Sequence, residues 1–173
     1  QLAVRAVAYQ FDNDGYIDTI TASYQSESAV IAERVAQGCI AVDRKVGGDE
    51  YTGFRLSALW QPIEQLSVTL SYLNQEIEQD GFTAVDINLP GDYQQTSMAV
   101  DSGGQGEFIT NETDIVNLVL EYDLGWGTLF SSTSNIEFEA ISGFDGSLLS
   151  FSTVPDSTFN FRDMDIFIEE LRF

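Results

Sequence analysis

Histidine is absent from the 173 residues, and Cys39 is the single cysteine. Without histidine the chain lacks the commonest general base, the usual activator of a serine or cysteine nucleophile, and the commonest metal ligand. One cysteine cannot form an intrachain disulfide, and with no histidine to activate it Cys39 is interpreted as structural or incidental. We therefore expect no enzymatic activity, and we assign no catalytic, cofactor-binding or metal-binding residue.

Positive charge is also scarce, because 7 Lys and Arg face 28 Asp and Glu, which gives a formal net charge of −21. Phosphate binding depends on Lys and Arg, so nucleic acid is excluded as a partner. Direct docking on an anionic membrane face is disfavoured for the same reason. An acidic surface suits an extracellular or outer-membrane protein, and it equally suits simple solubility.

Long apolar runs are missing too. No stretch of about 18 apolar residues occurs, which excludes a transmembrane helix, and no signal peptide is visible. The chain opens inside a strand-like run, LAVRAVAYQF, and closes inside another, FIEELRF. Because the termini of a domain usually lie outside its elements, this pattern predicts a piece of a longer chain.

What the sequence does contain is alternation with a period of two, which is typical of β-strands. In residues 66–73, LSVTLSYL, apolar and small polar side chains take opposite faces, and the segments at 51–62 and 113–124 behave in the same way. The segments at 2–9 and 128–139 follow the pattern less regularly. We predict an antiparallel meander of five full strands and the start of a sixth. One common face is predicted to hold Phe54, Leu56, Trp60, Leu66, Val68, Leu70, Val116, Leu118, Leu120 and Phe130.

The connections between these segments alternate in length. Short turns are expected near Pro62–Gln65 and Leu124–Gly127, and long segments at 12–50, 79–112 and 141–166. A transmembrane β-barrel predicts this alternation, with short periplasmic turns, long extracellular loops and strands of about ten residues. Trp60 and Trp126 lie beside the short turns, as interfacial aromatic residues would. The alternative is a water-soluble β-sandwich, a binding or carbohydrate-active module whose apolar faces pack together.

Three local motifs depart from the strand pattern or could bind ligands. SESAVIAERVAQG, residues 26–38, predicts a short surface helix between a serine cap and Gly38. FDNDGYID, residues 11–18, resembles a calcium loop, but with Gly15 at the sixth position the first and twelfth fall on Gln10 and Thr21, so a turn is favoured. The carboxylate pairs Glu76/Glu78, Glu137/Glu139 and Glu169/Glu170 are expected by chance in so acidic a chain.

An ordered series of motifs resembles TonB-dependent outer-membrane receptors. YTGFRLSALWQPIEQLSVTLSYL is similar to their repeated hairpin, in which an aromatic-rich strand ends in a Trp-x-Pro turn and Leu-x-Val-x-Leu returns. AYQFDNDGYID is similar to the segment that leads into one of their outer loops, and FIEELRF to a strand start, here with Glu170 and Arg172. The resemblance covers nearly the whole chain.

The resemblance implies that residues 1–173 are part of a 22-stranded barrel in the outer membrane of a Gram-negative bacterium. Such receptors carry an N-terminal plug domain and import scarce nutrients, most commonly iron–siderophore complexes, with energy transmitted by TonB. The plug and the TonB-contacting segment have no counterpart here, and about six strands are present. The implied partners are outer-membrane lipid, the receptor's own plug, TonB and a ligand such as a ferric siderophore.

Two further expectations follow for a barrel wall. Charged and polar residues of the second face should point into the lumen, since a charged side chain in lipid is costly; these are Arg5, Arg55, Asn117, Glu121, Glu170 and Arg172. Any ligand capture should come from the long loops, which hold aromatic residues that could contact a flat ligand. These aromatic residues are Tyr16, Tyr24, Phe82, Tyr93, Phe144 and Phe161.

Overall fold

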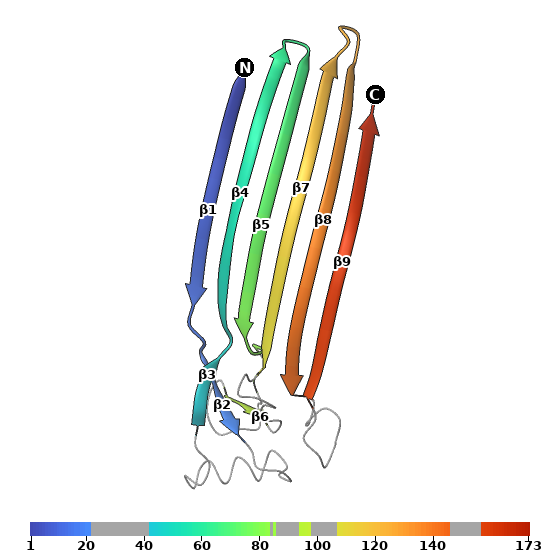
Figure 1. Ribbon diagram of the computed structural model, residues 1–173. Coiled ribbons are helices and arrows are strands. Elements are labelled where there is room, and N and C mark those ends of the chain that lie inside the picture. Colours follow the sequence, from blue (N-terminus) through green and yellow to red (C-terminus); the bar gives the residue numbers. More distant parts are fainter. Residues whose placement is uncertain (22–41, 84, 86–93, 98–106, 146–156) are drawn as a thin grey trace.

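The computed structural model describes residues 1–21, 42–83, 85, 94–97, 107–145 and 157–173. Six long strands form one sheet, in the order β1 (Leu2–Asn13), β4 (Gly48–Ile63), β5 (Leu66–Asp80), β7 (Phe108–Asp123), β8 (Thr128–Asp145) and β9 (Ser157–Arg172). Every neighbouring pair is antiparallel, and the strands follow one another in chain order (Figure 1). The predicted antiparallel meander is confirmed, and its sixth strand is a full strand of 16 residues.

The two short turns lie at one end of the sheet, together with both chain termini (Figure 1). Between β4 and β5 the chain reverses at Glu64 and Gln65, and Ile63 pairs with Leu66. Between β7 and β8, Gly125 adopts a φ of 79°, which L side chains rarely take, and its amide donates to Asp123 Oδ1 at 2.7 Å. The longer connections all lie at the opposite end of the sheet, so the predicted alternation in length is confirmed.

A small second sheet lies at that opposite end. It holds β3 (Val42–Val46), β2 (Ile17–Thr21) and β6 (Gln94–Ser97), and β2 runs antiparallel to β3 but parallel to β6. Ile17 and Val46, a cross-strand pair of this sheet, are the buried apolar residues of the described part of the chain. The hydrophobic core is thus small, and the long sheet has almost no buried side chain of its own.

The long strands extend further than the sequence pattern predicted. They run for 15 to 18 residues in β4, β5, β7, β8 and β9, against an expected ten. Residues 79–80, 108–112, 141–145 and 157–166, expected in loops, belong to strands, as do 12–13 and 48–50. The helix predicted at 26–38 lies outside the described residues, and no described residue is helical.

The register of the long sheet divides its side chains into two faces, because directly paired residues point the same way. Nine of the ten residues predicted to share a face do so, and we call this face A. Phe130 is the exception: it pairs with Glu121 and Arg172 and lies on the opposite face, face B, so that part of the prediction was wrong. The six polar residues predicted for the second face all lie on face B.

Candidate functional site

Face A is apolar in the half of the sheet nearest the short turns. Its side chains there are exposed or half-buried; Trp60 is 54% exposed and Leu70 is 50% exposed. We call this set the apolar band: Leu2, Val4, Ala6, Ala8, Phe54, Leu56, Ala58, Trp60, Leu66, Val68, Leu70, Tyr72, Val116, Leu118, Leu120, Tyr122, Leu129, Phe167 and Leu171. A contiguous exposed apolar surface of this extent indicates contact with lipid or with another protein surface.

The apolar band has one polar interruption, on β8 and β9. On β8 this face holds the polar residues Ser131, Thr133 and Asn135. The Thr133 hydroxyl donates to Oε2 of Glu169 on β9 at 2.9 Å. The band is therefore continuous over β1, β4, β5 and β7 and thins out towards the β9 edge.

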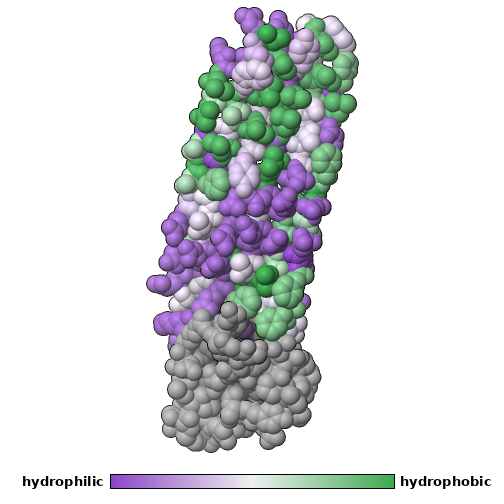
Figure 2. Space-filling model, viewed as in Figure 1, coloured by the Kyte–Doolittle hydropathy of each residue, from purple (hydrophilic) through white to green (hydrophobic). Residues whose placement is uncertain are grey.

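Beyond the apolar band, face A becomes acidic. The acidic band comprises Asp12, Glu50, Glu76, Glu78, Asp80, Glu112, Asp114, Glu137, Glu139, Asp163 and Asp165. Figure 2 shows the change, with hydrophobic surface largely towards the short turns and a hydrophilic belt crossing the strands below it. Within the described residues, face A of the long sheet carries no Lys or Arg.

The acidic band places like charges directly opposite one another. In one row Glu76, Glu112, Glu139 and Asp163 pair in turn across four strands, and in the next row Asp114 pairs with Glu137 and Glu137 with Asp165. Directly opposed like charges destabilise a sheet. Hydrogen bonds offset part of this repulsion. Asp114 accepts from the Tyr72 hydroxyl and, at 3.2 Å, from Asn74 Nδ2, which also donates to Glu112 Oε1 at 3.5 Å.

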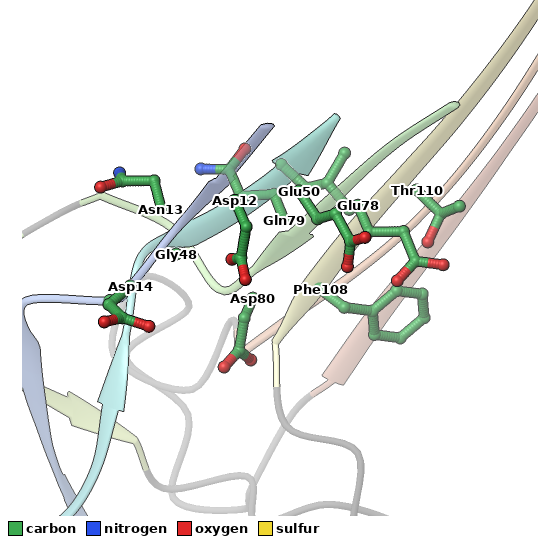
Figure 3. A pocket seen from close by; sticks show the side chains of 12 residues that line it. Asp12, Asn13, Asp14, Gly48, Glu50, Glu78, Gln79, Asp80, Phe108 and Thr110 are labelled. Carbon is green, nitrogen blue, oxygen red and sulfur yellow. The ribbon is translucent and has the colours of Figure 1, made fainter. Parts of the chain in front are cut away.

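A shallow pocket of about 380 Å³ opens at the end of the acidic band, between the ends of β1, β4, β5 and β7 (Figure 3). Carboxylates from several elements line it, among them Asp12, Asp14, Glu50 and Glu78, and Phe108 forms part of its wall. Asp12 and Asp14 of the calcium-like segment therefore both reach this pocket. Among the described residues, however, no group of three or more His, Cys, Asp or Glu is arranged to hold a metal ion.

Aromatic residues gather on face A beside the pocket. Phe108, Gly143 and Phe159 lie in one cross-strand row, with the two ring centroids 6.4 Å apart over the glycine, and Phe161 is 76% exposed. Phe144 and Phe161, which were expected in a loop, belong to β8 and β9. Phe82 packs edge-on against Phe144 at 6.0 Å, and Tyr16 is exposed between β1 and β2. Tyr24 and Tyr93 lie outside the described residues.

Face B reverses the order of polarity. Near the short turns it is mostly polar, although Val7, Leu59, Val119 and Ile168 also lie there. Asn117 Nδ2 donates to Ser134 Oγ at 2.8 Å and to Ser132 Oγ at 3.1 Å, and the hydroxyls of Ser57 and Ser71 are 3.0 Å apart. Arg172 forms an ion pair with Glu170, and its guanidinium lies 5.6 Å from the ring centroid of Phe130.

Opposite the acidic band, face B becomes largely apolar, although Gln75, Thr113, Asn111 and Arg162 also lie there. Its large apolar and aromatic residues in this part are Tyr9, Phe11, Tyr51, Leu73, Ile77, Ile115, Ile136, Phe138, Met164 and Ile166. The apolar surface thus changes sides half-way along the strands. Neither this change nor the acidic band was predicted from the sequence, although the period-two acids at Glu76/Glu78 and Glu137/Glu139 were a signal of the acidic band. Glu169 and Glu170, by contrast, point to opposite faces.

Comparisons with protein-family models, with curated proteins and with solved structures each give no match to this chain. Among the described residues, no helix has the length and apolar character needed to cross a membrane.

Proposed function

We propose that this chain forms part of the wall of a transmembrane β-barrel in a Gram-negative outer membrane. The barrel would be a TonB-dependent active transporter that imports a scarce nutrient, most commonly a ferric siderophore for receptors of this kind. The observation that carries the proposal is the exposed apolar band on face A, backed at the same level by a mostly polar face B. Lipid would cover the apolar band, and the polar residues of face B would line the lumen.

The dimensions of the apolar band support a lipid-facing role. From Trp60 to Phe54 it covers about 20 Å along β4, at about 3.3 Å per residue, against an outer-membrane apolar band about 25 Å tall. Trp60, Tyr122 and Trp126 lie at its short-turn end. Aromatic residues are enriched at membrane interfaces, where one end of the side chain is apolar and the other is hydrated.

The open edges of the sheet also support a barrel wall. β1 pairs only with β4, and β9 only with β8, so two edges of 12 and 16 residues present unpaired backbone groups within the described structure. Neither edge carries a proline or a bulge, which are two of the devices by which soluble proteins protect such edges. Charged side chains, a third device, are frequent on β9 but limited to Arg5 and Asp12 on β1. In a barrel, each edge pairs with the next strand of the wall.

A soluble β-sandwich would need a second sheet packed over the apolar band. The second sheet of the described structure is made of three short strands and lies beyond the far end of the long sheet (Figure 1). It therefore leaves the apolar band uncovered, and no contact among the described residues favours the sandwich.

The test uses the two tryptophans of the chain, Trp60 and Trp126, which both lie near the short turns. The chain is folded into phosphatidylcholine vesicles with brominated acyl chains, and tryptophan fluorescence is compared with that in unbrominated vesicles. We expect quenching, and a smaller quenching in a Trp60→Phe variant, since Trp60 lies on the lipid-facing side. A chain that is monomeric in buffer without detergent and shows no quenching would instead be a soluble module.

A further inference from the structure

Two arginines lie next to each other on face B, on the strands β1 and β4. Arg5 pairs with Ser57 and Arg55 pairs with Val7, so the two arginines take diagonal positions about 7–8 Å apart. Both side chains are exposed, and no ion pair or hydrogen bond joins either of them to another described residue. In a chain with a net charge of −21, two adjacent guanidiniums without a counter-charge indicate a site for an anion from outside the sheet.

Two neighbouring cross-strand rows of opposite polarity start at these arginines. The row of Arg5 continues with small polar side chains, and we call it the polar row: Ser57, Ser71, Asn117 and Ser134. The row of Arg55 continues with apolar side chains, and we call it the aliphatic row: Leu73, Ile115, Ile136 and Ile166. From β4 to β9 the aliphatic row crosses four strand spacings, about 19 Å at about 4.8 Å each.

The aliphatic row is narrow at its centre and wider at its far end. On β5 and β7 it is one side chain wide, because the polar row lies on one side and Gln75 and Thr113 lie on the other. On β8 and β9 it widens into an apolar patch that also holds Phe138, Met164 and Ile168. Ile166 is 40% exposed, so the far end of the row is open to a ligand.

We propose that face B binds an anionic amphiphile with an acyl chain, of which a fatty acid carboxylate is the simplest. Arg5 and Arg55 bind its carboxylate through charge-assisted hydrogen bonds. The acyl chain lies along the aliphatic row, with its end on the apolar patch of β8 and β9. The inference rests on the proposed function, because that function makes face B the wall of the lumen, and it names the class of substrate.

The distribution of charge and apolar surface selects this class of ligand. The acidic band lies on face A, whereas the described strands of the long sheet hold one acidic residue on face B between Arg55 and the end opposite the short turns, Asp49. A wholly apolar ligand would leave the two guanidiniums unpaired, and a wholly polar anion would leave the aliphatic row in water. An acyl chain joined to one anionic group matches both parts of the surface.

The experiment uses the 173-residue chain in phosphatidylcholine vesicles and a decanoic acid with a photoactivatable diazirine near the end of its chain. Labelled positions are mapped by mass spectrometry, with and without an excess of unlabelled decanoate or decanol. We expect face B of β8 and β9 to be labelled, and decanoate to suppress this labelling about tenfold better than decanol, because the alcohol lacks the charge that strengthens hydrogen bonds to arginine. Labelling of face A comes from probe dissolved in the lipid and should not be suppressed.

The variant Arg5→Gln/Arg55→Gln removes both guanidiniums and should abolish the advantage of decanoate over decanol. The matched control Arg162→Gln/Arg172→Gln removes two positive charges from face B of β9 and should keep that advantage. Quenching of tryptophan by brominated lipid shows whether each variant still folds into the membrane.

Three results would overturn the proposal: an undiminished advantage of decanoate in Arg5→Gln/Arg55→Gln, an equal loss in the control, or labelling that neither decanoate nor decanol suppresses. The last result would leave face B to the plug. Quenching by brominated lipid without suppressible labelling refutes the amphiphile site alone. Suppressible labelling in a chain that shows no quenching refutes the transmembrane wall alone, so the two failures are distinguishable.

Discussion

The ring of Tyr9 lies across Gly53, its directly paired neighbour on face B. A Cβ built at Gly53 would lie 2.5 Å from Tyr9 Oη and 2.9 Å from the carbonyl oxygen of Asn74. No side chain fits between the aromatic ring and the strand, so glycine is required here by close approach. An aromatic ring laid over a cross-strand glycine is a known device for fixing strand register.

The first prediction is that Gly53→Ala destabilises the sheet by about 1–3 kcal/mol, the usual range for overpacking. The loss should be smaller in a Tyr9→Ala background, where the ring clash is removed and only the Asn74 carbonyl remains. Gly127→Ala is the control, since an added Cβ there meets nothing within 4 Å. Urea unfolding in detergent micelles gives the free energy of unfolding for Gly53→Ala, for Gly53→Ala in the Tyr9→Ala background and for Gly127→Ala. Equal losses with and without Tyr9 would show that the ring does not set the constraint.

The second prediction compares neighbouring positions on β5. Leu70 belongs to the apolar band, and Thr69 lies on face B. Leu70→Arg should weaken folding into vesicles by about 2–4 kcal/mol, the cost of arginine near the bilayer midplane, whereas Thr69→Arg should be tolerated because it would face the lumen. Folding yield and urea midpoint in phosphatidylcholine vesicles provide the measurement. A larger loss for Thr69→Arg would reverse the assignment of the two faces.

The sequence predicted the strands and the face of nine residues because alternation within a strand is a local property. The relation between strands is not local, and Phe130 shows this. Its own strand places it in phase with Ile136 and Phe138, as the alternation indicates, but the pairing of Asp123 with Thr128 puts all three on face B. A shift of one residue at that turn would have exchanged the faces.

The strand ends were missed for a different reason. In residues 74–80, NQEIEQD, alternation continues, but Ile77 now occupies face B while Glu76 and Glu78 occupy face A. When a strand is predicted from apolar residues on face A alone, the predicted apolar stretch of β5 ends at Tyr72. The acidic band was missed with it, because carboxylates from six strands meet only through the register, and each pair alone is unremarkable in a chain with 28 acids.

The third prediction concerns Tyr51 on β4, which lies outside the apolar band. A hydrogen bond to the Asp49 carboxylate, with the charge of that carboxylate, raises the pKa of Tyr51 above its ordinary value of 10.0. A raised pKa in the folded state means that the neutral phenol is favoured there. The resulting stability is fully present below pH 10 and is lost as the pH rises through the folded-state pKa.

Alkaline titration of phenolate absorbance in the folded protein, taken as the difference between the wild type and Tyr51→Phe, isolates this group. Asp49→Asn should move the titration to lower pH, because it removes the negative charge. Asp49 also accepts a hydrogen bond from Asn13 Nδ2 at 2.9 Å, so Asn13→Ala is a suitable control for local disruption. An unchanged titration in Asp49→Asn would exclude the carboxylate as the cause.

The last prediction is that, if the chain belongs to the proposed transporter, ligand capture depends on the end of the sheet opposite the short turns. In a barrel wall, lipid covers one face and the lumen is occupied by the plug, so incoming solute first meets this end. It carries the small sheet, the Phe82–Phe144 pair and the connections at 81–107 and 146–156. Its carboxylates would repel a bare anion and accept a cationic or neutral complex.

Deletions should spare Phe108–Thr110, which belong to β7. We expect removal of residues 98–106, or of 147–154, to weaken surface binding of a ferric siderophore and to reduce uptake in proportion. Binding and uptake are measured separately, with Gly127→Ala at the short-turn end as the control. Unchanged affinity after both deletions would move recognition to the plug, and the connections would then serve only to shield the mouth of the barrel.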